Sequence, residues 1–159
     1  MNQFEAYMRI LEAFEKEELD YVLVGGFAVI LYGMQRLTRD IDIFIKMVPQ
    51  NIKKLRKALR SVFNDPSIKE ITLSALQKYP VIRYGSPNGL VVDILSRLGD
   101  VATYHDIAYK VIDIQGIKIK VATPETLYRL KKDTVRPEDQ LDAKFLKEII
   151  KKTKADQTD

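Results

Sequence analysis

The fold of this chain is decided by the stretch Val22-Leu23-Val24-Gly25-Gly26-Phe27-Ala28 and by Arg36-Leu37-Thr38-Arg39-Asp40-Ile41-Asp42-Ile43-Phe44-Ile45, which follows it. In the first stretch an apolar strand runs into a double glycine. In the second, two carboxylates stand two residues apart inside another apolar strand. Successive side chains of a strand point to opposite faces of its sheet. The isoleucines therefore share one face, which can enter a core, while Asp40, Asp42 and Phe44 share the other.

Two acids on one face of an apolar strand need a physical reason. Two unit charges about 4 Å apart repel by about 4 kcal/mol at an effective dielectric constant near 20. A divalent cation between Asp40 and Asp42 would remove this repulsion, and a donor set made only of oxygens suits Mg²⁺ or Mn²⁺ better than Zn²⁺. The alternative is the solvated face of an amphipathic strand, although aspartate is depleted in strands. The glycine turn just upstream favours the metal site.

Length and composition indicate a single α/β domain. The 159 residues are enough to bury a core, and 46% of them are apolar and 30% charged. The absence of cysteine excludes disulfides, thiolate metal sites and a cysteine nucleophile. With no visible signal peptide or membrane-spanning run, we expect a cytoplasmic protein. A net charge of +4 is compatible with an anionic partner without requiring one.

Apolar periodicity predicts helices and strands along the whole chain. Helices are predicted over residues 2–18 and 27–32, from Pro49, from 123 to about 132, and from Pro137 with Leu141, Phe145, Leu146, Ile149 and Ile150 facing inward. Strands are predicted over 21–24, 40–45, 81–84, 90–95, 110–114 and 118–121, with one hairpin at Ser86-Pro87-Asn88-Gly89 and another at Gln115-Gly116. Residues 65–79 are ambiguous and fit a short helix. We expect one domain over residues 1–152, with a core over about 19–122, C-terminal helices over about 123–152 and a polar, disordered tail over 153–159.

A third acid lies on a later strand. In Leu90-Val91-Val92-Asp93-Ile94-Leu95, Asp93 interrupts a strand that is otherwise apolar on both faces. An acid in such a place is usually paired, coordinated or catalytic. The alternative, which stays open at this point, is an aspartate at the end of a strand that caps the following loop.

These motifs together resemble those of the nucleotidyltransferase superfamily of DNA polymerase beta. The chain has a Gly-Gly turn after a strand, then Arg36-x-Thr38-x-Asp40-Ile41-Asp42, then an aspartate on a later strand. Within that superfamily it is similar to the compact prokaryotic Gly-Gly branch, which includes AbiEii-type toxins. The segments Glu125-Thr126-Leu127-Tyr128-Arg129-Leu130-Lys131 and Arg136-Pro137-Glu138-Asp139-Gln140-Leu141-Asp142 add to the resemblance. It spans about residues 19 to 150 and implies the nucleotidyltransferase fold, a small twisted mixed sheet with helices packed on it and a C-terminal helical segment.

The resemblance implies transfer of a nucleoside monophosphate from an NTP to a hydroxyl group, with pyrophosphate as the leaving group. Two Mg²⁺ ions, or Mn²⁺, about 3.5–4 Å apart would stabilise the attacking and leaving oxygens. Asp40 and Asp42 are expected to bind both ions. Asp93 is expected to bind the catalytic ion and to orient the acceptor hydroxyl or accept its proton.

Phosphate binding is expected from further residues around the acids. The backbone of Gly25 and Gly26 can approach the β- and γ-phosphates at a helix N-terminus, although a tight turn alone also requires glycine. Arg36 matches the family arginine, and a guanidinium suits bidentate contact with phosphate. Thr38 is expected to cap or orient the turn into the strand. Lys131 is the second phosphate candidate; Lys132 competes for that role, and an exposed helix lysine is the alternative.

Three other features favour ordinary structural roles. One predicted helix is crowded with basic residues, namely Lys53, Lys54, Arg56, Lys57 and Arg60. This pattern favours a solvated helix face over a tract that attracts tRNA. His105 is the only histidine, so a surface position is expected and a zinc site is not. Asp139 and Asp142 are expected to pair with Arg136 or to cap the last helix.

The sequence leaves two rival functions open. The chain could retain the fold without catalysis, as a binding or regulatory half of a toxin–antitoxin pair, or it could bind nucleic acid through its basic helix. For the enzyme, the expected partners are an NTP, such as ATP, and an acceptor hydroxyl on tRNA, on a protein or on a small molecule. A cognate antitoxin or toxin and a second copy of the chain are further candidate partners, and no membrane is expected.

Overall fold

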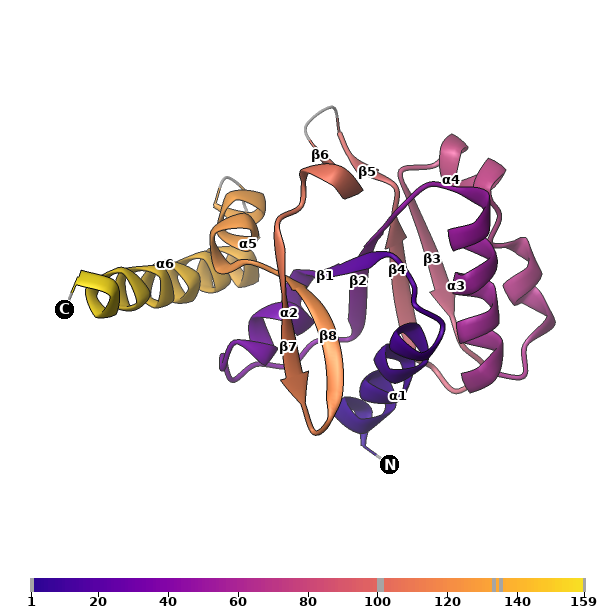
Figure 1. The fold of residues 1–159 in the computed structure, drawn as a ribbon, viewed down its shortest axis with the longest axis horizontal. Helices are drawn as coiled ribbons and strands as arrows, with labels where there is room; N and C mark the ends of the chain where they lie inside the picture. Colours follow the sequence, from indigo (N-terminus) through magenta and orange to yellow (C-terminus); the bar gives the residue numbers. More distant parts are fainter. Residues whose placement is uncertain (1, 100–101, 133, 135, 159) are drawn as a thin grey trace.

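The strands on both sides of the glycine turn lie in the middle of a six-stranded mixed sheet (Figure 1). The structure is a computed structural model that describes residues 2–99, 102–132, 134 and 136–158. The strands of the large sheet are β1 (Tyr21–Val24), β2 (Asp40–Ile45), β3 (Val81–Gly85), β4 (Val91–Leu95), β7 (Tyr109–Ile114) and β8 (Ile117–Ala122). A separate two-stranded ribbon is formed by β5 (Arg97–Leu98) and β6 (Ala102–Thr103).

The strand order of the large sheet is β3-β4-β2-β1-β8-β7. β2 runs parallel to β4, and β1 runs parallel to β8. The pairs β1–β2, β3–β4 and β7–β8 are antiparallel. This mixed sheet confirms the predicted α/β class, and it places β2 and β4, the two strands that carry acids, side by side.

Helices surround the sheet (Figure 1). They are α1 (Gln3–Lys16), α2 (Gly25–Leu31), α3 (Pro49–Val62), α4 (Leu73–Lys78), α5 (Pro124–Lys131) and α6 (Pro137–Thr158), with 3-10 turns η1 (Pro66–Glu70) and η2 (Tyr104–Asp106). Their starts follow local chemistry. The side chain of Asn2 accepts a hydrogen bond from the amide of Glu5, and Thr123 caps α5 in the same way just before a proline.

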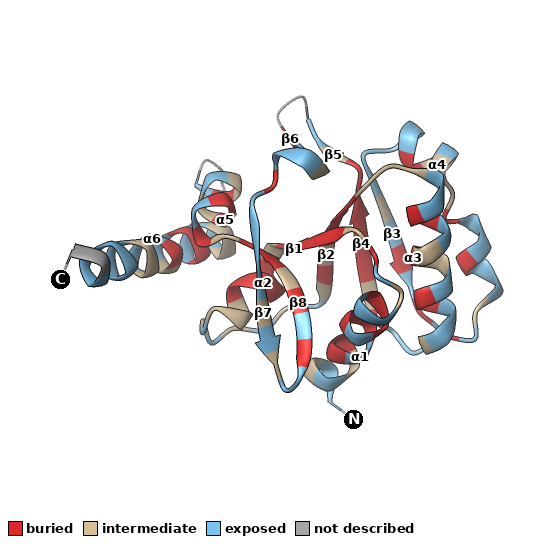
Figure 2. Ribbon diagram, in the orientation of Figure 1, coloured by how far each residue is buried: buried red, intermediate tan, exposed pale blue. Residues whose placement is uncertain are grey.

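The core lies between the sheet and the inner faces of α1 and α3 (Figure 2). The three isoleucines of β2 are fully buried, as the alternation of that strand predicts. Each fully buried side chain of this size stabilises the fold by roughly 1.5–3 kcal/mol relative to exposure. The opposite face of β2 carries the buried Phe44 together with the half-buried Asp40 and Asp42, so it is the face that holds the acids.

The structure moves the predicted start of one helix and defines two stretches that the sequence left open. α2 begins at Gly25 instead of residue 27, so both glycines belong to its first turn. The ambiguous stretch 65–79 forms η1 and the short helix α4. The segment after β4 forms the β5–β6 ribbon and η2, for which the sequence offered no periodic pattern because each element is only two or three residues long.

The last helix also differs from its prediction. α6 continues to Thr158 in place of the disordered tail expected from residue 153, because lysine, alanine and glutamine in this stretch are good helix formers. Figure 1 shows it extending away from the sheet. The inward position predicted for Leu141 is wrong, since this side chain is 60% exposed. The buried faces of α6 and α5 meet instead through Leu146 and Leu127.

Candidate active site

Asp40, Asp42 and Asp93 meet on one face of the sheet. Because β2 and β4 are parallel and in register, Asp42 lies directly opposite Asp93, and Asp40 precedes Asp42 on the same face. One carboxylate oxygen from each of the three lies within 4.8 Å of the others. We refer to these three residues as the acidic triad. The strand pattern predicted this convergence, and the structure brings the three side chains together.

The triad is electrostatically unfavourable without a cation. Burial, together with the neighbouring charges of Asp40 and Asp93, raises the pKa of Asp42 to about 8. Burial also raises the pKa of Asp40, with Asp93 adding to the effect and Arg83 opposing it. At this pKa Asp42 holds a proton near neutral pH unless a positive charge takes the place of the proton.

Arg83 closes one side of the triad, and the sequence analysis did not identify it. β3 pairs with β4 so that Arg83 lies directly opposite Asp93. Its Nε donates to Asp93 Oδ1 at 2.9 Å, and its Nη2 donates to Asp93 Oδ2 at 3.0 Å and to Asp40 Oδ2 at 3.4 Å. These contacts, above all the hydrogen bond to Asp93, raise the pKa of Arg83 above its ordinary value. The side chain is nevertheless 65% exposed, so the guanidinium lies on the open side of the triad.

Both glycines make close contacts, and the contact of Gly25 leaves no room for a side chain. Gly25 has a φ of +74°, and a Cβ at this position would collide with the carboxylate of Asp42. A Cβ on Gly26 would lie 3.1 Å from the guanidinium atoms of Arg36. The turn therefore lets the backbone approach Asp42 on one side and Arg36 on the other, which places the first turn of α2 against the acids.

The predicted phosphate residues Arg36 and Lys131 are both paired with one buried acid. Asp142 on α6 is fully buried, and its Oδ2 accepts hydrogen bonds from Arg36 Nη1 and, at 2.6 Å, from Lys131 Nζ. Lys131 also donates to Asp139 Oδ1 at 3.0 Å. Among the residues that the structure describes, Asp142 Oδ1 has no hydrogen-bond partner. We call Arg36, Lys131, Asp139 and Asp142 the Asp142 cluster; it ties the loop before β2 to α5 and α6.

This cluster corrects one prediction and refines another. Asp142 pairs with Arg36 and Lys131 instead of Arg136, because α6 turns its side chain inward under the glycine turn. Asp139 does lie near Arg136, at 3.7 Å, but its closer partner is Lys131. The competitor Lys132 is exposed, so Lys131 is the lysine that faces the acids.

The turn into β2 is held from two sides. Thr38 Oγ1 donates to the backbone carbonyl of Asp40 at 3.2 Å, as expected of a residue that orients this turn. Tyr7 of α1, which the sequence analysis did not single out, donates from its hydroxyl to the carbonyl of Arg39 at 2.6 Å. Both bonds fix the peptide units next to Asp40, so they hold its carboxylate in place.

The acidic triad lines a cavity of about 670 Å³, a size typical of ligand sites. The cavity is mostly polar, and it is also lined by the glycine turn, the loop 36–39, Lys131 and Arg136. Leu37, which is 91% exposed, stands at its rim. All eight residues proposed from the sequence for metal and phosphate line this one cavity; they are Gly25, Gly26, Arg36, Thr38, Asp40, Asp42, Asp93 and Lys131.

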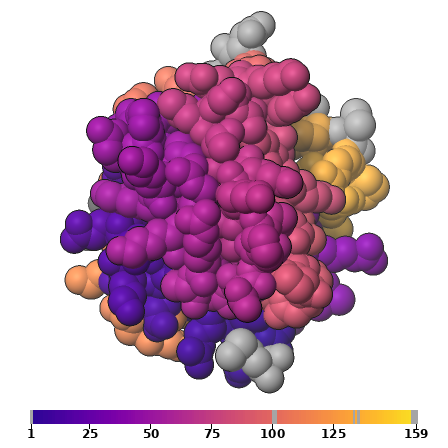
Figure 3. Space-filling view, turned by 90° about the vertical axis from the view of Figure 1, so that its right-hand side faces the viewer, coloured from indigo at the N-terminus to yellow at the C-terminus, as the bar shows by residue number. Residues whose placement is uncertain are grey.

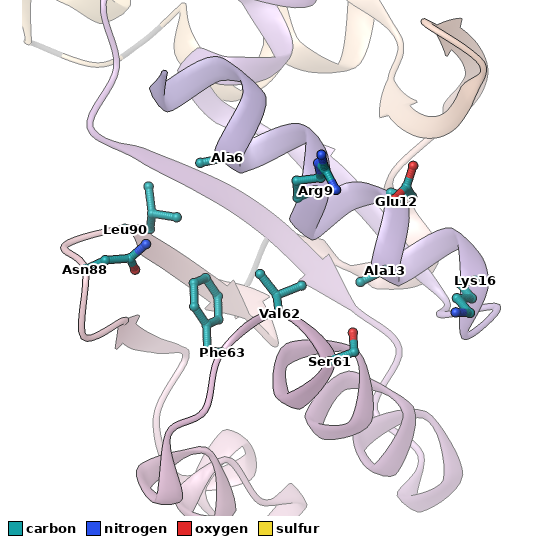
Figure 4. Close-up of a pocket in the computed structure, with 10 residues that line it drawn as sticks. All are labelled: Ala6, Arg9, Glu12, Ala13, Lys16, Ser61, Val62, Phe63, Asn88 and Leu90. Carbon is teal, nitrogen blue, oxygen red and sulfur yellow. The ribbon is translucent and has the colours of Figure 1, made fainter. Parts of the chain in front are cut away.

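A second cavity, of about 430 Å³, lies between α1 and the end of α3 (Figure 4). Its wall carries Arg9, Glu12 and Lys16 from α1, and Phe63 and Leu90 from the opposite side. The charged side chains stand along one helix and do not converge on a common point in Figure 4. This cavity therefore offers no metal-ligand set comparable with the acidic triad.

The basic helix is α3, which with η1 and α4 covers one side of the molecule (Figure 3). Three of its five basic side chains make local contacts: Lys54 with the carbonyl of Glu18, Arg56 with the carbonyl of Ile71, and Lys57 with Glu17. This pattern favours the solvated face. His105 is exposed, as predicted. Among the described residues, no helix combines the length and apolarity that a bilayer span requires.

Comparison with known structures agrees with this fold. The lincosamide antibiotic adenylyltransferase LnuA, solved with lincomycin bound, is 19% identical, with a TM-score of 0.63 over 92% of this chain and 97% of that chain. The protein JHP933 from Helicobacter pylori is 20% identical, with a TM-score of 0.56 over 91% and 64%. An antigenic nucleotidyltransferase-like protein from Paracoccidioides brasiliensis is 21% identical, with a TM-score of 0.52 over 87% and 71%. At these identities the likeness establishes the fold.

A family model gives the narrower assignment. The model described as "Nucleotidyl transferase AbiEii toxin, Type IV TA system" matches residues 9–143, which include the acidic triad, the glycine turn and the Asp142 cluster. A search of curated proteins gives no match. The chain therefore belongs to the AbiEii family of nucleotidyltransferase toxins.

Proposed function

We propose that this protein transfers a nucleoside monophosphate from an NTP to a hydroxyl group with the help of divalent cations bound at the acidic triad. The observation that carries the proposal is the meeting of three carboxylates from two parallel strands beside a glycine turn. The raised pKa of Asp42 supports it, because a site that favours a proton at neutral pH also favours a metal ion.

The residues fit Mg²⁺ or Mn²⁺. The donor set consists only of carboxylate oxygens, which lie within 4.8 Å of one another. Small side-chain rotations would let each oxygen approach a shared ion to the roughly 2.1 Å that a ligand bond to Mg²⁺ requires. Asp40 and Asp42 would hold two ions, and Asp93 one of them. When bound, such ions neutralise the charge that develops on the attacking and leaving oxygens.

The chain's own groups would bind and orient the two substrates. The first amides of α2, at Gly25 and Gly26, face the cavity and can donate to the phosphates of the NTP. Arg36 and Lys131 stand behind them and can contact phosphate by exchanging part of their bond to Asp142. Asp93 lies on the other side of Asp42, where its carboxylate would orient the acceptor hydroxyl or accept its proton.

The acceptor is open among tRNA, a protein side chain and a small molecule. LnuA, which shares the fold, is an adenylyltransferase of a small antibiotic. The toxin family supports a macromolecular target and a cognate antitoxin as partner. We further propose that the enzyme works in the cytoplasm, where NTPs are available, and that ATP is its first candidate donor.

Incubation with each α-³²P-labelled NTP, Mg²⁺ and a cell extract tests the proposal. Label is expected on one class of molecule, and digestion with ribonuclease or protease tells RNA from protein. The matched control is Asp106→Asn, which removes an aspartate of the exposed turn η2. Labelling by this control but not by Asp42→Asn supports the proposal, whereas equal labelling by both variants contradicts it.

A second candidate function has one observation in its favour. Arg36 and Lys131, the two predicted phosphate-binding cations, are both already engaged by Asp142, as in a scaffold that has lost catalysis and acts as a binding or regulatory module. Calorimetric titration of NTP with and without Mg²⁺ separates the two. Binding that requires Mg²⁺ indicates the enzyme, and its absence indicates the scaffold.

A further inference from the structure

The guanidinium of Arg83 already forms hydrogen bonds with two of the three carboxylates of the acidic triad. It bonds both oxygens of Asp93, at 2.9 and 3.0 Å, and reaches Asp40 Oδ2 at 3.4 Å. A planar guanidinium that bonds both oxygens of one carboxylate is a specific and strong arrangement. A positive charge therefore stands at the triad before any metal arrives.

Two other cations of the same cavity, Lys131 and Arg136, form their hydrogen bonds with acids outside the triad. Lys131 is bonded to Asp139 and Asp142, and Arg136 is bonded to Glu138 at 2.7 Å. Arg136 influences Asp40 through space only, as a weak effect on the pKa of that carboxyl. Within the described residues, Arg83 is thus the cation whose hydrogen bonds go to the triad itself.

The position of Arg83 lets its side chain move while its backbone stays fixed. Its strand, β3, is the edge strand of the large sheet and is held by β4 over its whole length. Its side chain is 65% exposed, so it can swing outward into solvent without opening the core. The register that places it opposite Asp93 is set by the same hairpin that positions Asp93.

We propose that Arg83 is an internal counter-cation of the acidic triad, which competes with the divalent ion for Asp40 and Asp93. The inference rests on the proposed function, because it requires a metal at the triad. In the metal-free protein, Arg83 holds Asp93 and Asp40 together against their repulsion. When an ion is bound, Nη2 leaves Asp40, while the bond from Nε to Asp93 can remain, since a carboxylate oxygen accepts more than one bond. Arg83 is then a positioning residue that also sets the concentration of divalent ion at which the acidic triad becomes occupied.

Binding of Mn²⁺, followed by electron paramagnetic resonance, tests the competition directly. Arg83→Gln removes the competing charge, so the dissociation constant for Mn²⁺ is expected to fall about fivefold, the scale of one exposed charge pair. Arg136→Gln is the matched control, because Arg136 lines the same cavity and is 68% exposed but is bonded to other acids. Its effect on the dissociation constant is expected to be clearly smaller.

Thermal unfolding in EDTA provides a second measurement that does not depend on activity. Without its counter-cation, the metal-free Arg83→Gln protein is expected to melt roughly 2–4 °C below the unaltered protein. Saturating Mn²⁺ is expected to close this gap, because the ion then supplies the charge. Arg83→Lys keeps the charge but not the fork of donors, so its affinity for Mn²⁺ is expected to lie between those of the other two proteins.

The outcomes separate the two proposals. If the unaltered protein binds Mn²⁺, Asp42→Asn does not, and Arg83→Gln binds no more tightly than Arg136→Gln, the counter-cation is overturned while the metal site stands. If Mn²⁺ binds none of these proteins at the triad, both proposals are overturned. Should Arg83→Gln not fold, the Lys variant decides, since unchanged or weaker binding by it also contradicts the competition.

Discussion

Two charged clusters share one cavity and differ in how their charges are balanced. In the acidic triad, three carboxylates face the single guanidinium of Arg83, which is 65% exposed, and Asp40 and Asp42 are only half-buried. In the Asp142 cluster, two carboxylates pair with two cations, so the charges balance, and the cluster is mostly buried. Burial and repulsion raise the pKa of Asp42 in the first cluster, whereas in the second Lys131 and Arg136 hold the pKa of Asp139 below its ordinary value against the effect of burial.

The difference in charge balance indicates that the acidic triad is a binding site, whereas the Asp142 cluster holds elements of the fold together. A balanced, buried cluster stabilises the packing of the elements that supply it, here the loop before β2 with α5 and α6. An unbalanced cluster on an open face is destabilising until a cation from outside joins it. The same types of side chain thus serve opposite purposes within one cavity, and removal of a carboxylate charge is expected to have opposite effects on the stability of the two clusters.

Asp42→Asn should give the largest effect on activity and a gain in stability. Loss of a direct metal ligand is expected to lower nucleotidyl transfer by at least roughly a hundredfold, since even outer partners of metal ligands commonly contribute 10- to 100-fold. In EDTA at pH 8 the melting temperature should rise, because one of three repelling charges is removed. Transfer assays and thermal unfolding check the two halves. A variant that loses stability instead would place Asp42 in a structural pair.

Asp142→Asn should show the reverse pattern. Removal of this buried charge leaves Arg36 and Lys131 without their shared partner, and breaking such a pair is expected to destabilise the protein by about 3 kcal/mol. The melting temperature should fall by roughly 6–12 °C for a chain of this size. Urea unfolding measures the free energy, and Mn²⁺ binding provides the contrast, since the dissociation constant is expected to change little. Unaltered stability would mean that the cluster does not hold α6.

The pH dependence of stability should reveal the triad in the absence of metal. The pKa of Asp42 is about 8 in the folded protein and near the ordinary aspartate value when unfolded, so between these values the folded state binds more protons. Stability in EDTA is therefore expected to fall as pH rises from 5 to 8, by about 5 °C in melting temperature. The lowered pKa values of Asp65, Glu138 and Asp139 act below this range.

Two controls sharpen this pH experiment. Saturating Mg²⁺ should flatten the profile between pH 5 and 8, since the ion replaces the proton. Asp42→Asn should flatten it without metal. A profile that keeps its slope in the Asn variant would assign the proton to another group, and the reading of Asp42 as the strained carboxylate would be wrong.

The sequence was sufficient to predict the three acids of the site, because charged residues are not expected in strands that are otherwise apolar. A strand with a buried face has no reason to carry Asp40 and Asp42, and Asp93 is the single polar residue of an apolar run. The glycine turn and the capped helices were visible for similar local reasons. The Asp142 cluster was not visible, because a helix position does not reveal a partner 106 residues away.

Arg83 was missed for a reason of register. A two-residue Asn-Gly turn would pair Pro87 with Leu90, which would set Arg83 on the face opposite to Asp93. The structure instead pairs Gly85 with Val91 across a longer loop, with the amide of Ser86 bonded to the carbonyl of Leu90. This shift of one residue turns Arg83 toward the triad. The Asn-Gly dipeptide alone predicts a two-residue turn, so it could not predict this register or the position of Arg83.

Glu138→Gln should have the smallest effect, and it tests whether burial or mere pairing decides stability. Glu138 accepts two hydrogen bonds from Arg136, at 2.7 and 3.0 Å, and Arg136 lowers its pKa. Both side chains are exposed, however, at 45% and 68%, so water screens the pair. The melting temperature at pH 7 is expected to stay within about 1 °C of the unaltered value. A fall as large as that of Asp142→Asn would show that α6 is held by its exposed N-terminal pair. It would then be wrong that the buried, balanced Asp142 cluster is what stabilises the packing of α6.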